Sequence, residues 1–208
     1  MLRLRVGNLV LVMIEDYMLN GKWAKFKNQL PTCSGAKWRD MSARCSTHNR
    51  NLSYATYELC TVSDTFKDFQ IFANWHRKQV GYATNYHLDK DLLCINNTVY
   101  HEDHCVLIPP ELNYFIRGSV ARRGGTPQGV SFDTERQKYL SSISICNKAK
   151  NLGRFNTPEE ARKAYYSAKN AIAANWHKRL TSGEFIVDCR IVEAMRTWDT
   201  EERYYEAR

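Results

Sequence analysis

KNLGRFNTPEEARKAY, residues 150–165 of the chain, is the stretch that decides the fold of its second half. Its centre predicts the start of a helix: Thr157 is a suitable N-cap, and Pro158 fits the first helical position. Glu160 completes a capping box, because its carboxylate can accept a hydrogen bond from the N-cap backbone N–H. Small side chains then recur at helical spacing, so we expect this helix to lie close on a sheet.

Three strands are expected before this helix, at residues 129–132, 139–145 and 150–155. Within residues 139–145 every second side chain falls on the same face, as in a strand that is buried on one side. The sequence therefore predicts a three-stranded antiparallel sheet packed on one helix.

Positive charge is concentrated in the same part of the chain. Residues 117–180 contain thirteen Lys and Arg against four acidic residues, a net charge of +9, while the whole chain carries +8. Residues 1–116 are close to neutral and residues 181–208 are acidic. A basic block of this kind favours a polyanionic partner.

The Gly- and Arg-rich segment 117–128 is the predicted domain boundary. We expect four parts: an N-terminal segment (1–35), a first module (36–116), the basic module (117–180) and an acidic tail (181–208). The tail predicts a short strand over Phe185–Val187, followed by a helix up to Arg208.

The sequence of the N-terminal half predicts short helices and turns. Asn20-Gly21 favours a tight hairpin turn. Residues 36–48 predict a helix, and a second is expected from Ser63, its N-cap, to Lys78. Four aromatic residues at intervals of three mark the buried face of this second helix: Phe66, Phe69, Phe72 and Trp75.

Residues 86–116 predict the order strand, turn, strand, helix. An extended segment over residues 87–93 leads to a turn at Asn96-Asn97, and residues 98–100 are expected to return as a strand. After a compact stretch up to Ile108, Pro110 opens a helix that continues to Ile116. The whole chain is therefore expected to be an α+β protein.

Composition excludes several classes. Hydrophobic residues make up 43% of the chain and aromatic residues 12%, enough for a buried core. The longest apolar run, residues 9–14, is too short to cross a bilayer, so no membrane partner is expected and we predict a cytoplasmic protein. Seven scattered cysteines without a C-x-x-C pair favour buried thiols over disulfides. A cluster of Cys94, His101, His104 and Cys105 leaves zinc as an alternative, although its spacing fits no common zinc module.

The basic module resembles the ethylene-response-factor type DNA-binding domain of plants, which also occurs in bacteriophage endonucleases. The resemblance lies in Gly129-Val130, in Tyr139 before a strand, and in residues 151–161 with Ala164-Tyr165. That family lays its three-stranded sheet in the major groove of double-stranded DNA. The resemblance implies that the following side chains face DNA, the first two through phosphates: Arg122, Arg123, Arg136, Lys138, Lys148, Lys150 and Arg154.

The first module resembles the HNH homing endonucleases of bacteriophages that carry the same DNA-binding domain. The matching residues lie in three groups: Trp38 to Cys45, Cys60 to Trp75, and Leu88 to Asn113. The resemblance implies an HNH-like ββα region, with supporting helices, that holds one divalent metal, Mg²⁺ or Mn²⁺. If the chain is phage-encoded, as the resembled endonucleases are, the expected location is the cytoplasm of the host cell.

The same resemblance assigns roles to individual residues. His87 takes the position of the general base, Asn113 that of the helix metal ligand, and His104 that of a supporting residue. The family has Asp or Asn before its histidine, but this chain has Tyr86, so Asp89 or Asp91 would have to complete the metal shell.

Two functions follow from these expectations. The first is a metal-dependent endonuclease of phage homing type that cuts or nicks double-stranded DNA. The alternative is a non-catalytic DNA-binding protein, a regulator or an inhibitor of host defence, with a decayed HNH site. Tyr86 favours the alternative, whereas His87 and Asn113 favour the enzyme.

Overall fold

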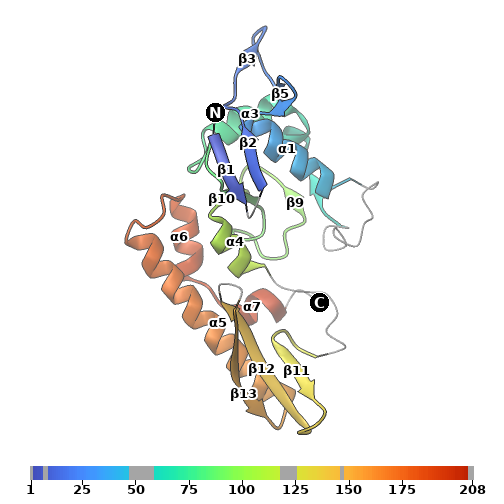
Figure 1. Cartoon of the computed structure of the whole chain (residues 1–208), viewed down its shortest axis with the longest axis vertical. Helices are drawn as coiled ribbons and strands as arrows, with labels where there is room; N and C mark the ends of the chain where they lie inside the picture. Colours follow the sequence, from blue (N-terminus) through green and yellow to red (C-terminus); the bar gives the residue numbers. More distant parts are fainter. Residues whose placement is uncertain (1, 7–8, 47–58, 118–125, 146–147, 206–208) are drawn as a thin grey trace. The chain divides into compact units, whose positions relative to one another are not determined.

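The computed structural model describes residues 2–6, 9–46, 59–117, 126–145 and 148–205 (Figure 1). Contacts divide the chain into two compact units. The first contains Met1–Pro110 and Ile186–Ile191, and the second contains Glu111–Phe185 and Val192–Arg208. The predicted boundary at 117–128 falls mostly outside the described residues.

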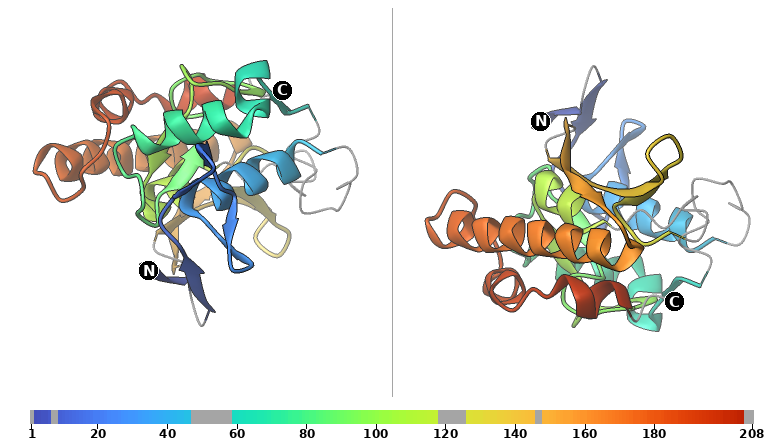
Figure 2. Two further views of the ribbon diagram at one scale, coloured as in Figure 1. Left: turned by 90° about the horizontal axis from the view of Figure 1, so that it is seen from above. Right: turned by 90° about the horizontal axis from the view of Figure 1, so that it is seen from below.

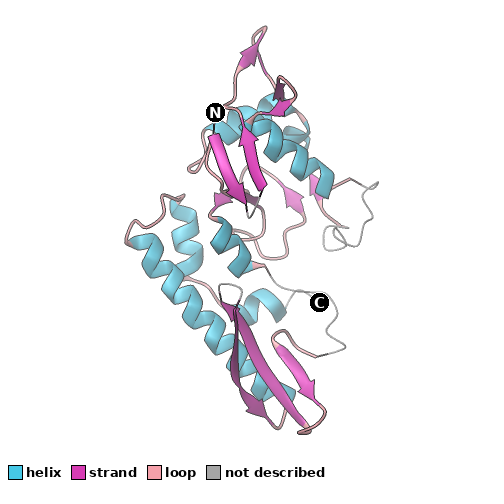
Figure 3. Cartoon of the chain, in the orientation of Figure 1, coloured by secondary structure: helices cyan, strands magenta, loops and turns pink. Residues whose placement is uncertain are grey.

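The first unit begins with three antiparallel hairpins, whose strands are coloured magenta in Figure 3. They are formed by the strands β1 (Leu2–Val6) and β2 (Leu9–Met13), β3 (Met18–Leu19) and β4 (Lys22–Trp23), and β5 (Phe26–Lys27) and β6 (Leu30–Pro31). Asn20 and Gly21 both have positive φ, 51° and 73°, as a two-residue hairpin turn requires. The predicted Asn-Gly hairpin is confirmed.

Helix α1 (Cys33–Arg44) begins three residues before its predicted start. The reason is its N-cap: the hydroxyl of Thr32 accepts a hydrogen bond from the backbone N–H of Gly35. The helix buries Met41 against the aromatic side chains of the first unit.

The predicted helix from Ser63 to Lys78 is two helices, α2 (Asp64–Lys67) and α3 (Phe69–Arg77). Ser63 is the N-cap, as predicted. The break is at Asp68, which has an extended backbone and whose carboxylate accepts from the N–H of Gln70, so it caps the second helix. The predicted aromatic face is confirmed, because Phe66, Phe69 and Phe72 are buried.

The short strands of residues 87–108 do not form the predicted hairpin, in which residues 98–100 return after the turn at Asn96-Asn97. Strand β8 (His87–Asp89) is shorter than expected, and it pairs antiparallel with β10 (Val106–Ile108). Strand β9 (Val99–Tyr100) does form, but it pairs in parallel with β7 (Thr61–Val62). The expected extension of β8 to residue 93 is wrong, because a turn begins at Lys90. Helix α4 (Pro110–Ile116) has its predicted bounds.

The second unit contains the three-stranded antiparallel sheet predicted from the sequence, with β12 (Lys138–Ile145) between β11 (Val130–Asp133) and β13 (Lys148–Phe155). Helix α5 (Pro158–Thr181) packs along one side of it (Figure 2). Both hydrogen bonds of the capping box between Thr157 and Glu160 are present. The chain is thus a mixed α+β protein, as expected.

The tail differs from its prediction. Residues 185–187 have no regular structure, so the predicted strand is wrong, and Ile186 is 80% exposed. The helix is divided into α6 (Cys189–Arg196) and α7 (Thr200–Tyr205). Thr200 holds α7 to α5, because its backbone N–H and its hydroxyl both donate to Asn170 Oδ1. Over the residues that the structure describes, no helix has the length and apolarity that crossing a membrane requires.

Candidate nucleic-acid interface and nuclease site

The sheet of the second unit has two unlike faces. Val130, Ser141 and Ile143 are buried on the side that α5 covers. Side chains paired across antiparallel strands lie on the same face, so the register assigns the rest. We call the other side the open face. It carries Ser131, Asp133, Lys138, Leu140, Ser142, Ser144, Ala149, Asn151 and Arg154.

Two of the predicted DNA-facing residues, Lys138 and Arg154, lie on the open face and are exposed. Arg154 Nε donates to Asp133 Oδ2 over 3.0 Å, and Arg136, in the turn after β11, donates to the same carboxylate. The hydrogen bond from Arg154, assisted by Arg136, holds the pKa of Asp133 below its ordinary value. Asp133 therefore orients a guanidinium whose other N–H groups can donate to phosphate.

The other two strand lysines are placed differently. Lys150 is paired with Ile143 and Lys148 with Ile145, so both belong to the α5 side of the sheet, although both are exposed. The cause is a bulge: Ser141 pairs with Gly153, but Ser142 pairs with Asn151. The extra residue reverses the alternation of faces along the rest of β13. Arg122 and Arg123 lie outside the described residues.

The predicted general base, His87, is half-buried at the start of β8 and pairs with Ile108 of β10. The next pair, Leu88 and Leu107, belongs to the aromatic core of the first unit. Because faces alternate along a strand, His87 and Asp89 are on the side of β8 opposite that core.

Asp89 has a structural role in the loop that follows β8. Its Oδ1 accepts hydrogen bonds from the backbone N–H groups of Asp91, over 3.0 Å, and Leu92, over 2.7 Å. Burial, together with the nearby charge of Asp91, raises the pKa of Asp89 to about 6. The carboxyl group thus organises a turn at an electrostatic cost.

Asp91, the other predicted carboxylate ligand, pairs with the Lys90 ammonium. Lys90 is buried and also donates to the carbonyl oxygen of Asn97 over 2.6 Å. Burial lowers the pKa of Lys90, but the charge and hydrogen bond of Asp91 more than offset it, and the net shift is upward. The hydrogen bonds between Lys90 and Asn97 close the loop between β8 and β9.

The Asp89 environment predicts a pH-dependent stability. A carboxyl group whose folded pKa exceeds its unfolded value stabilises the fold below that unfolded value and loses this effect as the pH rises. The window runs from about 4 to about 6. Asp89→Asn keeps the acceptor for both N–H groups, so it should remove this dependence and raise stability at pH 7–8 by about 1–3 kcal/mol. Thermal melts of both proteins from pH 4 to 8 measure this; a destabilised Asp89→Asn at pH 8 would contradict it.

The remaining predicted site residues are dispersed. His104 is exposed in the turn before β10, where its ring centroid lies 5.7 Å from that of His101. Asn113 is half-buried on α4, which belongs to the second unit except for its first residue. Tyr86 packs on the aromatic core, and its ring occupies the space next to Gly81 where a Cβ would lie, 2.4 Å from Tyr86 Cδ2. Tyr86, at the position where the resembled family has Asp or Asn, is therefore a packing residue.

The predicted ligands do not fit a divalent metal in this arrangement. Asp89 is committed to a turn and Asp91 to Lys90. Within the described ranges, no three His, Cys, Asp or Glu side chains are grouped as a metal ion requires. Cys105, one of the four residues of the zinc alternative, lies fully buried in the aromatic core, where burial raises the pKa of its thiol.

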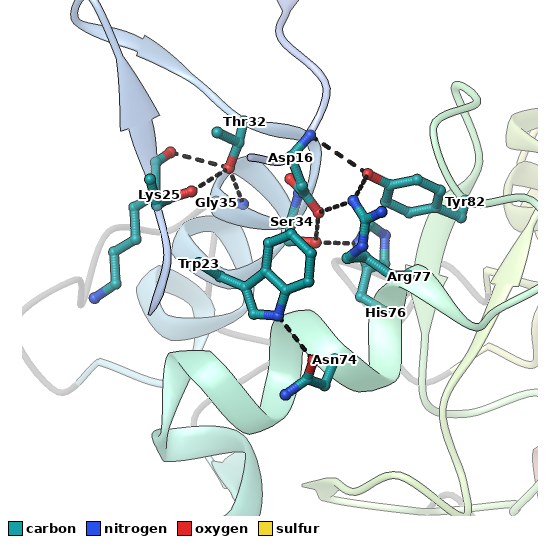
Figure 4. A network of polar contacts seen from close by, with 11 residues as sticks. Asp16, Trp23, Lys25, Thr32, Ser34, Gly35, Asn74, His76, Arg77 and Tyr82 are labelled. Carbon is teal, nitrogen blue, oxygen red and sulfur yellow. Dashed lines mark hydrogen bonds and ion pairs between the residues drawn. The ribbon is translucent and has the colours of Figure 1, made fainter. Parts of the chain in front are cut away.

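A buried polar network in the first unit was not foreseen from the sequence (Figure 4). The hydroxyl of Ser34 donates to the Asp16 carboxylate and lies 2.7 Å from His76 Nδ1. Since the serine proton goes to Asp16, Nδ1 must donate to the serine oxygen. Burial, with the charges of Lys37 and Arg77, lowers the pKa of His76 to about 3, so the ring is neutral.

The order of this network, Asp to Ser to His, is not that of a hydrolase triad, in which the histidine lies between the other two. Ser34 and His76 are also buried. The network joins the segment before β3 to α1 and α3 and is structural. No motif marks it, because its three residues are far apart in the sequence.

Comparison of the chain with protein-family models, with curated proteins and with solved structures found no match to any of them.

Proposed function

We propose that the protein binds double-stranded DNA through the open face of β11, β12 and β13. The observation that supports this most directly is the composition of that face. Four of its side chains are small, Ser131, Ser142, Ser144 and Ala149, and two are basic, Lys138 and Arg154. Small side chains allow a sheet to approach DNA closely, and the basic ones supply phosphate contacts.

Charge supports the same proposal. Residues 117–180 carry a net charge of +9, and the whole second unit, which includes the acidic residues of the tail, carries 16 Lys and Arg against 11 Asp and Glu, a net +5, with basic residues exposed on both sides of its sheet. Such a unit attracts DNA before any specific contact forms. The proposed contact is the one that the resemblance to the ethylene-response-factor type domain implies.

The register of the sheet gives a matched pair of variants to test this. Lys138→Ala/Arg154→Gln removes two charges from the open face, and Lys148→Ala/Lys150→Gln removes two from the α5 side. Each phosphate contact contributes about 0.9 to the slope of log affinity against log salt. We expect the first variant to flatten the slope by about two units and the second to flatten it less, measured by fluorescence anisotropy with a labelled duplex. Equal slopes for wild type and the open-face variant would contradict the proposal.

An HNH-type endonuclease is the second candidate, and a specific observation favours it. Strands β8 and β10 are antiparallel, and α4 follows β10 directly in the chain, which is the order expected of a ββα region. His87 lies on the first of these strands. The engaged carboxylates of Asp89 and Asp91 favour instead the non-catalytic alternative, a DNA-binding protein with a decayed site. Incubation with supercoiled plasmid and Mg²⁺ or Mn²⁺ distinguishes the two by nicked or linear product.

A further inference from the structure

Two consecutive tight hairpins, β3–β4 and β5–β6, form a small protruding element of the first unit, residues 18–31, which we call the double hairpin (Figure 3). Both turns have positive φ at their two central residues: 51° and 73° at Asn20 and Gly21, 51° and 64° at Asn28 and Gln29. Turns with this geometry match the twist of the strands and fix their register. The double hairpin is thus a defined shape.

Helix α3 holds the first hairpin firmly. The side chain of Gln70 pairs with the backbone of Trp23 as a neighbouring strand would: Oε1 accepts from the N–H over 2.6 Å, and Nε2 donates to the carbonyl over 2.9 Å. The indole Nε1 of Trp23 donates to Asn74 Oδ1 over 2.8 Å (Figure 4). These three hydrogen bonds preorganise the hairpin.

The second hairpin is held by the start of α1. The Thr32 hydroxyl donates to the carbonyl of Ala24, and the carbonyl of Lys25 lies so close to Gly35 that a Cβ there would be 2.1 Å from its oxygen. The Lys25 ammonium lies 3.7 Å from the centroid of the Trp38 ring. Lys25 is therefore part of the anchor.

The outward side chains of this rigid element are unusually apolar. Exposed fractions are 53% for Met18, 60% for Leu19, 45% for Phe26 and 38% for Leu30. Single exposed apolar residues need no explanation, but four within fourteen positions of a preorganised element suggest a contact surface.

The charge of the double hairpin identifies the chemistry of its partner. Residues 17–32 include three lysines and no acidic residue. Lys22 and Lys27 are exposed, and no carboxylate of the described residues lies within ion-pair distance of either; the Lys27 ammonium lies 5.1 Å from the centroid of the Tyr17 ring. Positive charge without a carboxylate partner, beside apolar side chains, is complementary to a polyanion with apolar surfaces, and DNA presents phosphates next to sugar and base edges.

We propose that the double hairpin is a second DNA contact of this protein, in the first unit, separate from the sheet. Lys22 and Lys27 bind phosphates, and Leu19 and Leu30, which pair with these lysines across the two hairpins, pack against sugars and bases beside them. This inference rests on the proposed DNA-binding function and extends it to a surface for which the family resemblance implies no role.

The test uses the full chain and a duplex long enough for both units, about 40 base pairs. Lys22→Ala/Lys27→Ala is expected to flatten the slope of log affinity against log salt by about two units, as two lost phosphate contacts require. The matched control, Lys67→Ala/Lys78→Ala, removes two other exposed lysines of the first unit and is expected to leave the slope unchanged. Equal slopes for the hairpin variant and this control would overturn the inference.

A second variant tests the apolar part. Leu19→Ser/Leu30→Ser keeps the charge, so we expect the affinity to fall about 5-fold or more with an unchanged salt slope. If wild type does not bind DNA at all, the proposed function fails. If it binds and both hairpin variants bind equally well, only this inference fails. A wild-type dimer in sedimentation that Leu19→Ser/Leu30→Ser dissociates, with unchanged DNA affinity, would assign the surface to a second copy of the chain.

Discussion

Gly129→Ala is expected to destabilise the second unit by about 2–5 kcal/mol, which lowers its melting temperature by about 10 °C or more. Two effects add. Gly129 has φ +73°, which costs a residue with a Cβ about 1–2 kcal/mol. In addition, the new Cβ would lie 2.0 Å from Cδ2 of Tyr165, a buried residue of α5, and relief of such an overlap costs about 1–3 kcal/mol.

Gly183→Ala is the matched control for this prediction. Gly183 also has positive φ, +81°, but a Cβ there would meet no atom within 4 Å. Gly183→Ala should therefore lose only the stability that the positive φ costs a residue with a Cβ. Calorimetry of the full chain compares the two variants, and equal losses would mean that Tyr165 does not pack over Gly129.

This packing bears on how much of the fold could be predicted. The features set by neighbouring residues were predicted correctly: the hairpin at Asn20-Gly21, the N-cap at Ser63, and the capping box of Thr157 with its long helix. In each case the hydrogen bond joins groups within three residues of each other, so the local sequence determines it.

Features that depend on distant residues were not predicted. Residues 98–100 were expected to return towards β8, but β9 pairs with β7, about forty residues upstream. The loop held by Asp89 and by Lys90 leads the chain away from β8. Likewise, no local signal joins Asp16, Ser34 and His76.

The candidate interface shows most clearly what an alternating sequence pattern cannot predict, namely the face of the sheet on which each side chain lies. Strict alternation from Arg154 would put Leu152, Lys150 and Lys148 on one face with it. The bulge opposite Ser141 and Ser142 adds one residue, so both lysines move to the other side. The basic composition of the sheet could be predicted from sequence, but the face that each residue occupies could not, because a bulge has no fixed sequence signature.

If the protein is an endonuclease with His87 as its general base, His87→Ala should reduce cleavage of supercoiled plasmid by about 10²–10⁴-fold, equivalent to roughly 3–5 kcal/mol of barrier. DNA affinity should stay within about 2-fold of wild type, since the proposed DNA contacts are on the sheet and the double hairpin. His177→Ala is the matched histidine control, because His177 lies on α5 and is not one of the predicted site residues, so this variant is expected to retain activity.

Comparing cleavage by His87→Ala with cleavage by Asp89→Asn tells whether Asp89 binds a metal or only organises its turn. If Asp89 only organises its turn, Asp89→Asn should cut as wild type does, whereas a metal-binding Asp89 should lose cleavage with its stability kept. Wild type that binds DNA but never cuts it, with either metal, would favour the non-catalytic alternative. The variant Tyr86→Asp, which introduces the residue that the resembled family has at this position, would also remove a ring packed on Gly81 and the aromatic core, so a thermal melt must accompany any assay of it. Cleavage by His87→Ala at the wild-type rate, with His177→Ala also active, would exclude His87 as the base.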